Sequence, residues 1–196
     1  MSRIACIGFA VFLCSFFGIR AQIPNPGFES WNGNQPDGWR AYWTQPYSPY
    51  SFESKVPQAK EGNWALRSDI LLTGRYYNPS GIYSGSESTG YYFPVSGKVR
   101  AFKGWYILEN KGLDTLTIQI RMKKEGLEIG RAGLNILEPT SEYKPFIVPI
   151  EYEQNEEADS MRIEISFNHG IPWSGHEGSH FIIDDLALDI LGSDQN

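Results

Sequence analysis

Cysteine is almost absent from the sequence, which contains only Cys6 and Cys14. Both lie in the first 21 residues, where Arg3 precedes an apolar run over residues 4–17 and a polar-to-small segment follows at 18–21. This arrangement is typical of a secretory signal peptide, and we expect cleavage after Ala21. An exported chain without cysteine forms no disulfides, so residues 22–196 must be stabilised by their hydrophobic core or by a metal ion.

Long apolar runs and an excess of positive charge are also missing. After residue 21, no stretch stays apolar for the ~20 residues that a membrane-spanning helix needs. Removal of the leader takes away Arg3 and Arg20 and no acidic residue, so the formal charge of -6 becomes more negative by two. Such acidity argues against nucleic acids and anionic membranes as partners. We therefore expect one domain over residues 22–196, exported to the periplasm, the outer-membrane surface or the medium.

Catalytic motifs and helical periodicity are absent as well. The chain has no G-x-S-x-G elbow, no H-E-x-x-H and no P-loop, and residues 22–196 offer no cysteine nucleophile. Pairs of carboxylates are no evidence for a glycosidase here, because a chain with 23 acidic residues contains such pairs by chance. We therefore expect a protein without catalytic activity, and a polysaccharide hydrolase or lyase remains the enzyme alternative.

Period-two alternation of apolar and polar residues dominates what is present. Residues 116–122 place leucine, isoleucine and methionine at every second position, and residues 161–167 repeat this pattern. Further strand-like runs lie at 91–95, 99–108, 127–135, 143–152 and 181–190, separated by turn residues. The pattern predicts an antiparallel β-sandwich of jelly-roll type with about eight or nine strands.

The run GSHFIIDDLALDI over residues 178–190 predicts the strand that closes the sheet. Its alternation assigns Asp184 to the same face as Ile182, Leu186, Leu188 and Ile190. A buried carboxylate is costly unless a cation or several hydrogen-bond donors compensate it. A hard cation takes oxygen ligands from such groups, and Glu29 is the first partner to test. The alternative is that Asp184 caps a backbone turn and that Glu29 is a solvated edge residue.

Several segments together resemble a known family. In order along the chain they are NPGFESW, PDGW, EGNWAL, YYFPVSGKVRAFKGWYILE, KPFIVPIEYE, MRIEISF and GSHFIIDDLAL. This ordered set resembles the carbohydrate-metabolism domain of Bacteroidetes surface proteins and, more distantly, galactose-binding-like carbohydrate-binding modules. The resemblance implies a non-catalytic jelly roll that is exported to the cell envelope and takes part in glycan capture or use.

The same resemblance implies one structural calcium ion. In related modules a calcium is held between the glutamate of the GFE triplet and the acid of the last strand. Here these residues are Glu29 and Asp184, with Asp185 as the alternative in register and backbone carbonyl groups near residues 61–63 as further ligands.

Aromatic residues are more numerous than a core alone usually requires, with 6 Trp, 11 Tyr and 11 Phe. Sugar rings stack on flat aromatic faces, and planar polar side chains bind their hydroxyl groups. Trp173 with His176 in the Gly-rich loop, and Tyr42, Trp43 and Tyr47 in the Pro-rich connection, are the aromatic candidates. The candidate hydrogen-bonding residues are Gln119, Arg121, Arg162 and Glu164, provided that their strands are neighbours on one face.

Three alternatives stay open at this stage. Trp173 could instead fold back and close one end of the sandwich. The exposed aromatic side chains could anchor a protein partner of the envelope rather than a sugar. His169, His176 and His180 lack the spacing of a structural zinc site, and we expect solvated loop histidines.

Overall fold

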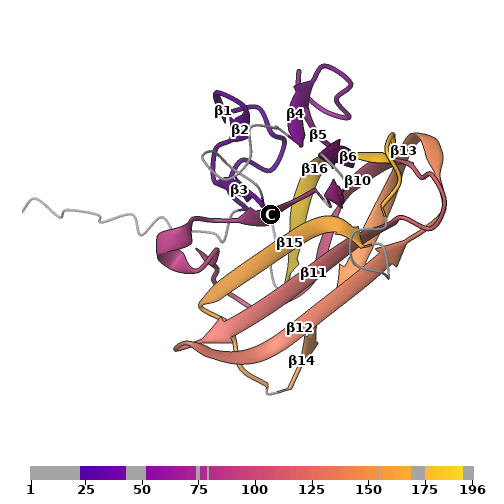
Figure 1. Cartoon of the computed structure of the whole chain (residues 1–196). Helices are drawn as coiled ribbons and strands as arrows, with labels where there is room; N and C mark the ends of the chain where they lie inside the picture. The colour runs from indigo at the N-terminus through magenta and orange to yellow at the C-terminus, as the bar shows by residue number, and fades with distance from the viewer. Residues whose placement is uncertain are drawn as a thin grey trace, which may run out of the picture.

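Two antiparallel β-sheets face each other across a shared hydrophobic core (Figure 1). The computed structural model describes residues 23–42, 52–73, 76–78, 80–153, 155–168 and 175–191. The larger sheet contains, in spatial order, β14 (Glu151–Tyr152), β12 (Leu127–Ile136), β11 (Thr115–Lys124), β15 (Ser160–Asn168), β8 (Gly81–Ser84) and β3 (Trp39–Ala41), with β9 (Phe93–Pro94) also paired to β15. The smaller sheet contains β13 (Thr140–Pro149), β10 (Val99–Glu109), β16 (His180–Ile190), β5 (Ala65–Asp69) and β4 (Glu53–Val56).

The remaining elements are short. Two hairpins pair β1 (Trp31–Asn32) with β2 (Gln35–Pro36), and β6 (Leu71–Thr73) with β7 (Tyr76–Asn78). A single 3-10 turn spans Glu87–Thr89, and the described residues include no helix with the length and hydropathy that a membrane crossing requires. The antiparallel jelly-roll β-sandwich confirms the predicted fold class.

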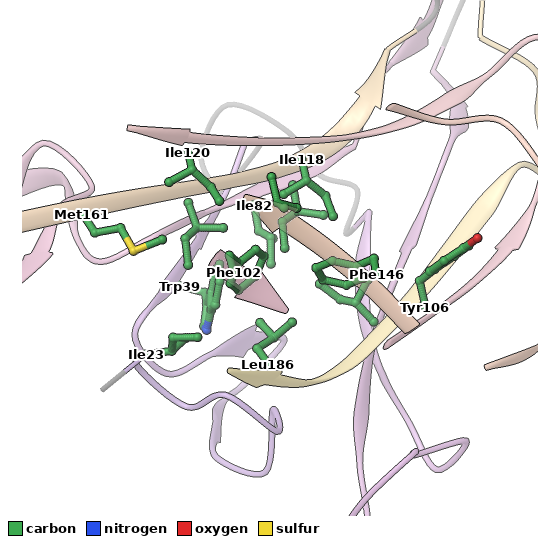
Figure 2. Packing of buried hydrophobic residues seen from close by; sticks show 14 of the residues in the cluster. Ile23, Trp39, Ile82, Phe102, Tyr106, Ile118, Ile120, Phe146, Met161 and Leu186 are labelled. Carbon is green, nitrogen blue, oxygen red and sulfur yellow. The ribbon is translucent and has the colours of Figure 1, made fainter. Parts of the chain in front are cut away.

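The central strands of the larger sheet follow the predicted alternation. Leu116, Ile118, Ile120 and Met122 of β11 are almost completely buried, and each lies opposite an apolar residue of β15. Figure 2 shows side chains of both sheets meeting in this core, with Ile118 and Ile120 on one side and Phe102 and Leu186 on the other. The polar residues between them therefore face away from the core.

The predicted alternation is wrong for the first half of the closing strand, because β16 carries a β-bulge. Lys103 of β10 lies opposite Ala187, whereas Trp105 lies opposite Asp184, so two residues of β16 oppose Gly104 alone. Asp185 adopts the left-handed conformation there, with φ of 50°. The bulge inverts the faces: Ile183 and Leu186 belong to the main core, whereas Ile182 belongs to a separate outer cluster with Ala65 and Ile107. Asp184 shares the outer face of the smaller sheet with Ile182, not the core face.

The predicted strand over 143–152 is divided between the two sheets. Residues up to Pro149 belong to β13 beside β10, and Glu151–Tyr152 pair with β12 as β14. Ile150, at the transition, donates its N–H to the carbonyl oxygen of Arg100 at 2.9 Å. Proline at 145 and 149 lacks the N–H that a central strand needs, which suits the edge position of β13.

Candidate functional site

The polar residues of β11 and β15 come together on one surface. Cross-strand register places Gln119 opposite Glu164 and Arg121 opposite Arg162. Side chains that lie directly opposite in an antiparallel pair are close enough to act together. The expectation that these four residues share one face is confirmed. We call this solvent-facing surface of β12, β11, β15 and β8 the open face.

Strand β12 extends the open face on one side. Its Arg131, Gly133 and Asn135 lie opposite Arg121, Gln119 and Thr117. The Thr117 hydroxyl donates to the Asn135 side-chain oxygen at 3.0 Å. A Cβ added at Gly133 would have only the carbonyl oxygen of Ile118 within 4 Å, at 3.8 Å, so the surface is open there. A hollow of about 620 Å³ lies over strands β11 and β12, and the residues that line it include Glu128 and Glu151.

A stack of three tyrosines borders the open face on the other side. Tyr83 of β8, which lies opposite Glu164, is sandwiched between Tyr42 and Tyr91. The ring centroids are 4.7 Å and 4.8 Å apart, at interplanar angles of 25° and 24°. The two neighbouring rings therefore cover both faces of Tyr83, and Tyr42 and Tyr91 are half-buried at the two ends of the stack.

Hydrogen bonds fix the tyrosines relative to the strand residues. The Tyr42 hydroxyl donates to Oε1 of Glu164, and Nη2 of Arg162 donates to Oε2 of the same carboxylate at 3.1 Å. Burial, followed by the bond to Glu164, raises the pKa of Tyr42 far above its ordinary value, so the phenol stays protonated. A Cβ at Gly81 would come within 2.9 Å of the Tyr42 ring and 2.6 Å of Ser166 Cβ. Glycine at 81 therefore leaves the space in which the Tyr42 ring lies.

The other predicted sugar-binding residues do not join this surface. Trp43, Tyr47, Trp173 and His169 lie outside the described residues. His176 is held at one end of the sandwich, where its backbone N–H donates to Oδ2 of buried Asp114 at 3.0 Å. Arg121 lies six residues beyond Thr115 on β11, roughly 20 Å along the strand at about 3.3 Å per residue, so His176 and Arg121 do not belong to one site.

His176, Asp114 and Ser179 are the residue types of a catalytic triad, but their hydrogen bonds differ from those of a triad. Nδ1 of His176 lies 3.2 Å from Oδ1 of Asp114, and the Ser179 hydroxyl donates to the same carboxylate. In a serine nucleophile the hydroxyl would bond to the imidazole instead. Asp114 is therefore a structural acceptor that holds two loops together.

Sequence reasoning missed Tyr83, Tyr91, Arg131 and Asn135. Residues 76–90 are rich in Gly, Ser and Tyr and carry no clear strand pattern, and β8 is a strand of only four residues. Arg131 lies in β12, where alternation is weak because the strand is half exposed. The turn residues Glu125 and Gly126 could have predicted a hairpin of β11 and β12. The pairing of such a hairpin places Arg131 opposite Arg121.

The two acids proposed as metal ligands both bind one loop of the chain. Oδ2 of Asp184 accepts the N–H groups of Lys60 and Glu61 at 2.7 Å and 3.0 Å, and its Oδ1 accepts that of Asp185 at 2.8 Å. Oε1 of Glu29 accepts two further N–H groups of this loop, at positions 63 and 64, at 2.8 Å and 2.9 Å. Burial raises the pKa of Asp184 against the opposing effect of these bonds, whereas the bond from residue 64 lowers the pKa of Glu29.

Hydrogen bonds already compensate both carboxylates without a calcium ion. Calcium takes six to eight oxygen ligands, whereas the groups directed at Glu29 and Asp184 are N–H donors. Asp185, the alternative ligand, forms the bulge. Over the described parts of the chain, no group of three or more His, Cys, Asp or Glu side chains is suited to a metal. The calcium ion stays a prediction, and we derive no role for it.

Removing calcium is therefore expected to leave stability unchanged. Since N–H donors already satisfy both carboxylates, the melting temperature in EDTA should agree within about 1 °C with that in excess CaCl₂, because a ligand raises stability only when it binds the folded state. Differential scanning calorimetry measures this directly. A rise of several degrees with CaCl₂, lost in an Asp184→Asn variant, would establish the calcium site instead.

Comparison with known proteins identifies the fold. No family model and no curated protein sequence matches this chain. Among solved structures, the family 61 carbohydrate-binding module TmCBM61, in complex with β-1,4-galactotriose, is similar with a TM-score of 0.56 and 15% identity, over 87% of this chain and 99% of that chain. A proposed glycoside hydrolase from Bacteroides thetaiotaomicron has a TM-score of 0.55 and 13% identity, over 71% of this chain and 57% of its own. The enzymatically active domain of tailspike protein 4 from bacteriophage CBA120 has a TM-score of 0.55 and 12% identity, over 87% of this chain and 21% of its own. At these identities the likeness establishes a shared jelly-roll sandwich, and carbohydrate-binding modules and parts of larger enzymes both have it.

Proposed function

We propose that the protein is an exported, non-catalytic carbohydrate-binding β-sandwich and that the open face is its binding surface. The observation that carries the proposal is the hollow of about 620 Å³ over β11 and β12. Gln119 in its lining lies opposite Glu164, and Glu164 lies opposite Tyr83 of the tyrosine stack, so the hollow and the stack belong to one surface. The solved complex of TmCBM61 with a galactotriose shows that a module of this fold binds sugar, which supports the proposal. The sequence resemblance to envelope proteins of Bacteroidetes supports glycan capture at a bacterial cell envelope.

The side chains of the open face have the chemistry that sugars require. Gln119, Asn135 and the arginines present planar groups that donate or accept several hydrogen bonds. The half-buried rings of Tyr42 and Tyr91 are the aromatic groups beside this polar surface, and the apolar side of a pyranose stacks on rings of this kind. Gln119, Asn135 and the arginines stand on strands of one sheet, so little backbone conformational entropy is lost when a ligand binds.

Two carboxylates of the open face are engaged as ion-pair partners. Glu164 accepts from Tyr42 and Arg162, and Glu128 accepts from Arg121 at 3.1 Å. A glycoside hydrolase needs two carboxyl groups that flank the scissile bond, one of them as an acid. The arrangement favours ligand binding over hydrolysis.

Replacing Gln119 with alanine tests the proposal. The exposed Gln119 side chain lies at the centre of the open face. Its removal should weaken glycan binding about tenfold, the effect of losing one or two hydrogen bonds. Isothermal titration with galactan, xylan and uronate-containing polysaccharides would measure this.

A matched control is Arg100→Ala on the opposite sheet, where Arg100 pairs with Asp189 at 2.6 Å. This variant should bind glycans like the unaltered protein, and both variants should keep the same melting temperature. Equal binding by the Gln119→Ala variant and the unaltered protein would move the site away from the open face. Failure to bind any glycan would overturn the function.

A protein-docking role has one observation in its favour. Leu113 is 78% exposed and Leu137 is 52% exposed. Both lie near Asn110, whose side-chain amide donates to the Leu137 carbonyl oxygen at 3.1 Å. Exposed leucines at one end of a sandwich are suited to contact a protein partner of the envelope. Capture of such a partner that Leu113→Ser abolishes, together with blank glycan titrations, would favour this role.

A further inference from the structure

Three arginines form a row across the open face. Register places Arg162 of β15 opposite Arg121 of β11, and Arg121 opposite Arg131 of β12. Like charges directly opposite each other in a sheet are destabilising. The row therefore lowers the stability of the sheet, and stability does not explain why it is present.

Two of the three arginines have carboxylate partners on the open face. Arg121 Nη1 lies 3.1 Å from Glu128 Oε2, and Arg162 Nη2 lies 3.1 Å from Glu164 Oε2. These pairs hold the two guanidinium groups in place. Arg131 forms no ion pair with any described residue, although Glu151 of β14 is its register neighbour. The exposed Arg131 thus keeps all five of its N–H donors for a ligand in the hollow that it lines.

The charge of the open face opposes that of the whole chain. The chain carries a formal charge of -6. The surface nonetheless has more basic than acidic side chains. The basic ones are Arg121, Lys123, Arg131 and Arg162, and the acidic ones are Glu128 and Glu164. Arg40 of β3 and Glu151 of β14 lie on the strands beyond its two edges. A positive surface within an acidic protein attracts anions to that place and repels them elsewhere.

We propose that the open face is selective for acidic glycans, in which uronate carboxylates pair with Arg131. This inference rests on the proposed glycan-binding function and names the class of ligand for the same surface. Guanidinium binds carboxylate through two parallel hydrogen bonds, a geometry that the hydroxyl groups of a neutral sugar do not reproduce. Gln119, Asn135 and the tyrosines would contact the sugar hydroxyls and rings beside it.

The test compares acidic polysaccharides with their own carboxyl-reduced forms. Polygalacturonate, alginate and a glucuronan are each titrated into the protein before and after reduction of the carboxylates to alcohols. We expect at least one acidic polymer to bind about tenfold more tightly than its reduced form, as for the gain of one charge-assisted pair. Addition of about 0.5 M NaCl should remove most of this difference, because salt screens exposed charges.

Variants of Arg131 test whether this side chain causes the difference in affinity between the acidic and the carboxyl-reduced polymers. Arg131→Gln should reduce binding of the acidic polymer to the level of the reduced polymer, whereas Arg131→Lys should restore part of it. Arg100→Gln on the opposite sheet should change neither. Both positions are at the protein surface, and unchanged melting temperatures would show that the three variants fold.

The outcomes separate this inference from the function on which it rests. If neutral glycans bind and the acidic forms bind no better, the acidic selectivity is wrong and the glycan-binding function stands. If dextran sulfate binds as tightly as every uronate polymer, the attraction is general to polyanions and the carboxylate assignment is wrong. If no polysaccharide binds, both proposals fall.

Discussion

Replacing Asp184 with alanine is expected to lower the free energy of unfolding by about 3 to 5 kcal/mol. The substitution leaves the N–H groups of Lys60, Glu61 and Asp185 without their acceptor. Each buried donor left unsatisfied costs about 1–3 kcal/mol, and removing the desolvated carboxylate returns part of that sum. For a chain of this size the loss corresponds to a melting temperature lower by roughly 10 °C.

Two further variants separate the hydrogen bonds from the charge. Asp184→Asn keeps one acceptor oxygen and should lose about half as much stability. Asp185→Asn is the matched control, since asparagine tolerates the left-handed backbone of the bulge and should stay within about 0.5 kcal/mol. Urea unfolding of the three variants measures the differences. A loss below about 1 kcal/mol in Asp184→Ala would mean that other contacts hold the loop, such as Lys60 over the Trp105 ring at 4.5 Å.

The strands were predictable wherever one face packs on the core. Residues 116–122 and 161–167 alternate regularly because β11 and β15 are central strands with one buried and one solvated face. The same reasoning gave the wrong faces for residues 182–184, whereas Leu186, Leu188 and Ile190 face the core as predicted. A single extra residue at Asp185 inverts the alternation between the two halves of the strand, and Asp-Asp carries no turn signal that marks a bulge. The sequence therefore marked Asp184 as unusual but assigned it to the wrong side.

The open face was predictable only in part, for a related reason. Gln119, Arg121, Arg162 and Glu164 are outward residues of two regular strands, so they share a surface once those strands pair. The tyrosine stack depends on contacts between residues distant in sequence, since Tyr42 reaches Glu164. Composition identified Tyr42 as an aromatic candidate, but the pairing of β3, β8 and β15 determines its neighbours.

Stability is expected to fall as the pH rises from 6 to 9, because of Glu53. This glutamate of β4 is 3% exposed, and its Oε1 accepts the N–H of Gly81, which belongs to the opposite sheet, at 3.3 Å. Burial raises the pKa of Glu53 to about 8, and the charge of Asp69 acts in the same direction. The folded state therefore binds a proton that the unfolded state releases near pH 4.5.

The sign follows from this difference in proton binding. The contribution of Glu53 is fully present below about pH 4.5, decreases as the pH rises and is lost above the folded pKa of about 8. Between pH 6 and 9 the expected loss is about 2 to 3 kcal/mol, at 1.36 kcal/mol per pH unit below the folded pKa. Carboxyl groups with lowered pKa values, such as Glu29 and Asp189, change the stability only at lower pH. They do not contribute to the change between pH 6 and 9.

A Glu53→Gln variant should remove most of this pH dependence, because glutamine keeps the size and polarity of a protonated glutamic acid without ionising. We expect the difference in stability between the variant and the unaltered protein to grow in favour of the variant by about 2 to 3 kcal/mol between pH 6 and pH 9. Urea unfolding at pH 6, 7, 8 and 9 measures both proteins, and the exposed Glu142→Gln serves as the control that changes no slope. Parallel curves for the Glu53→Gln variant and the unaltered protein would show that Glu53 is already ionised in the fold.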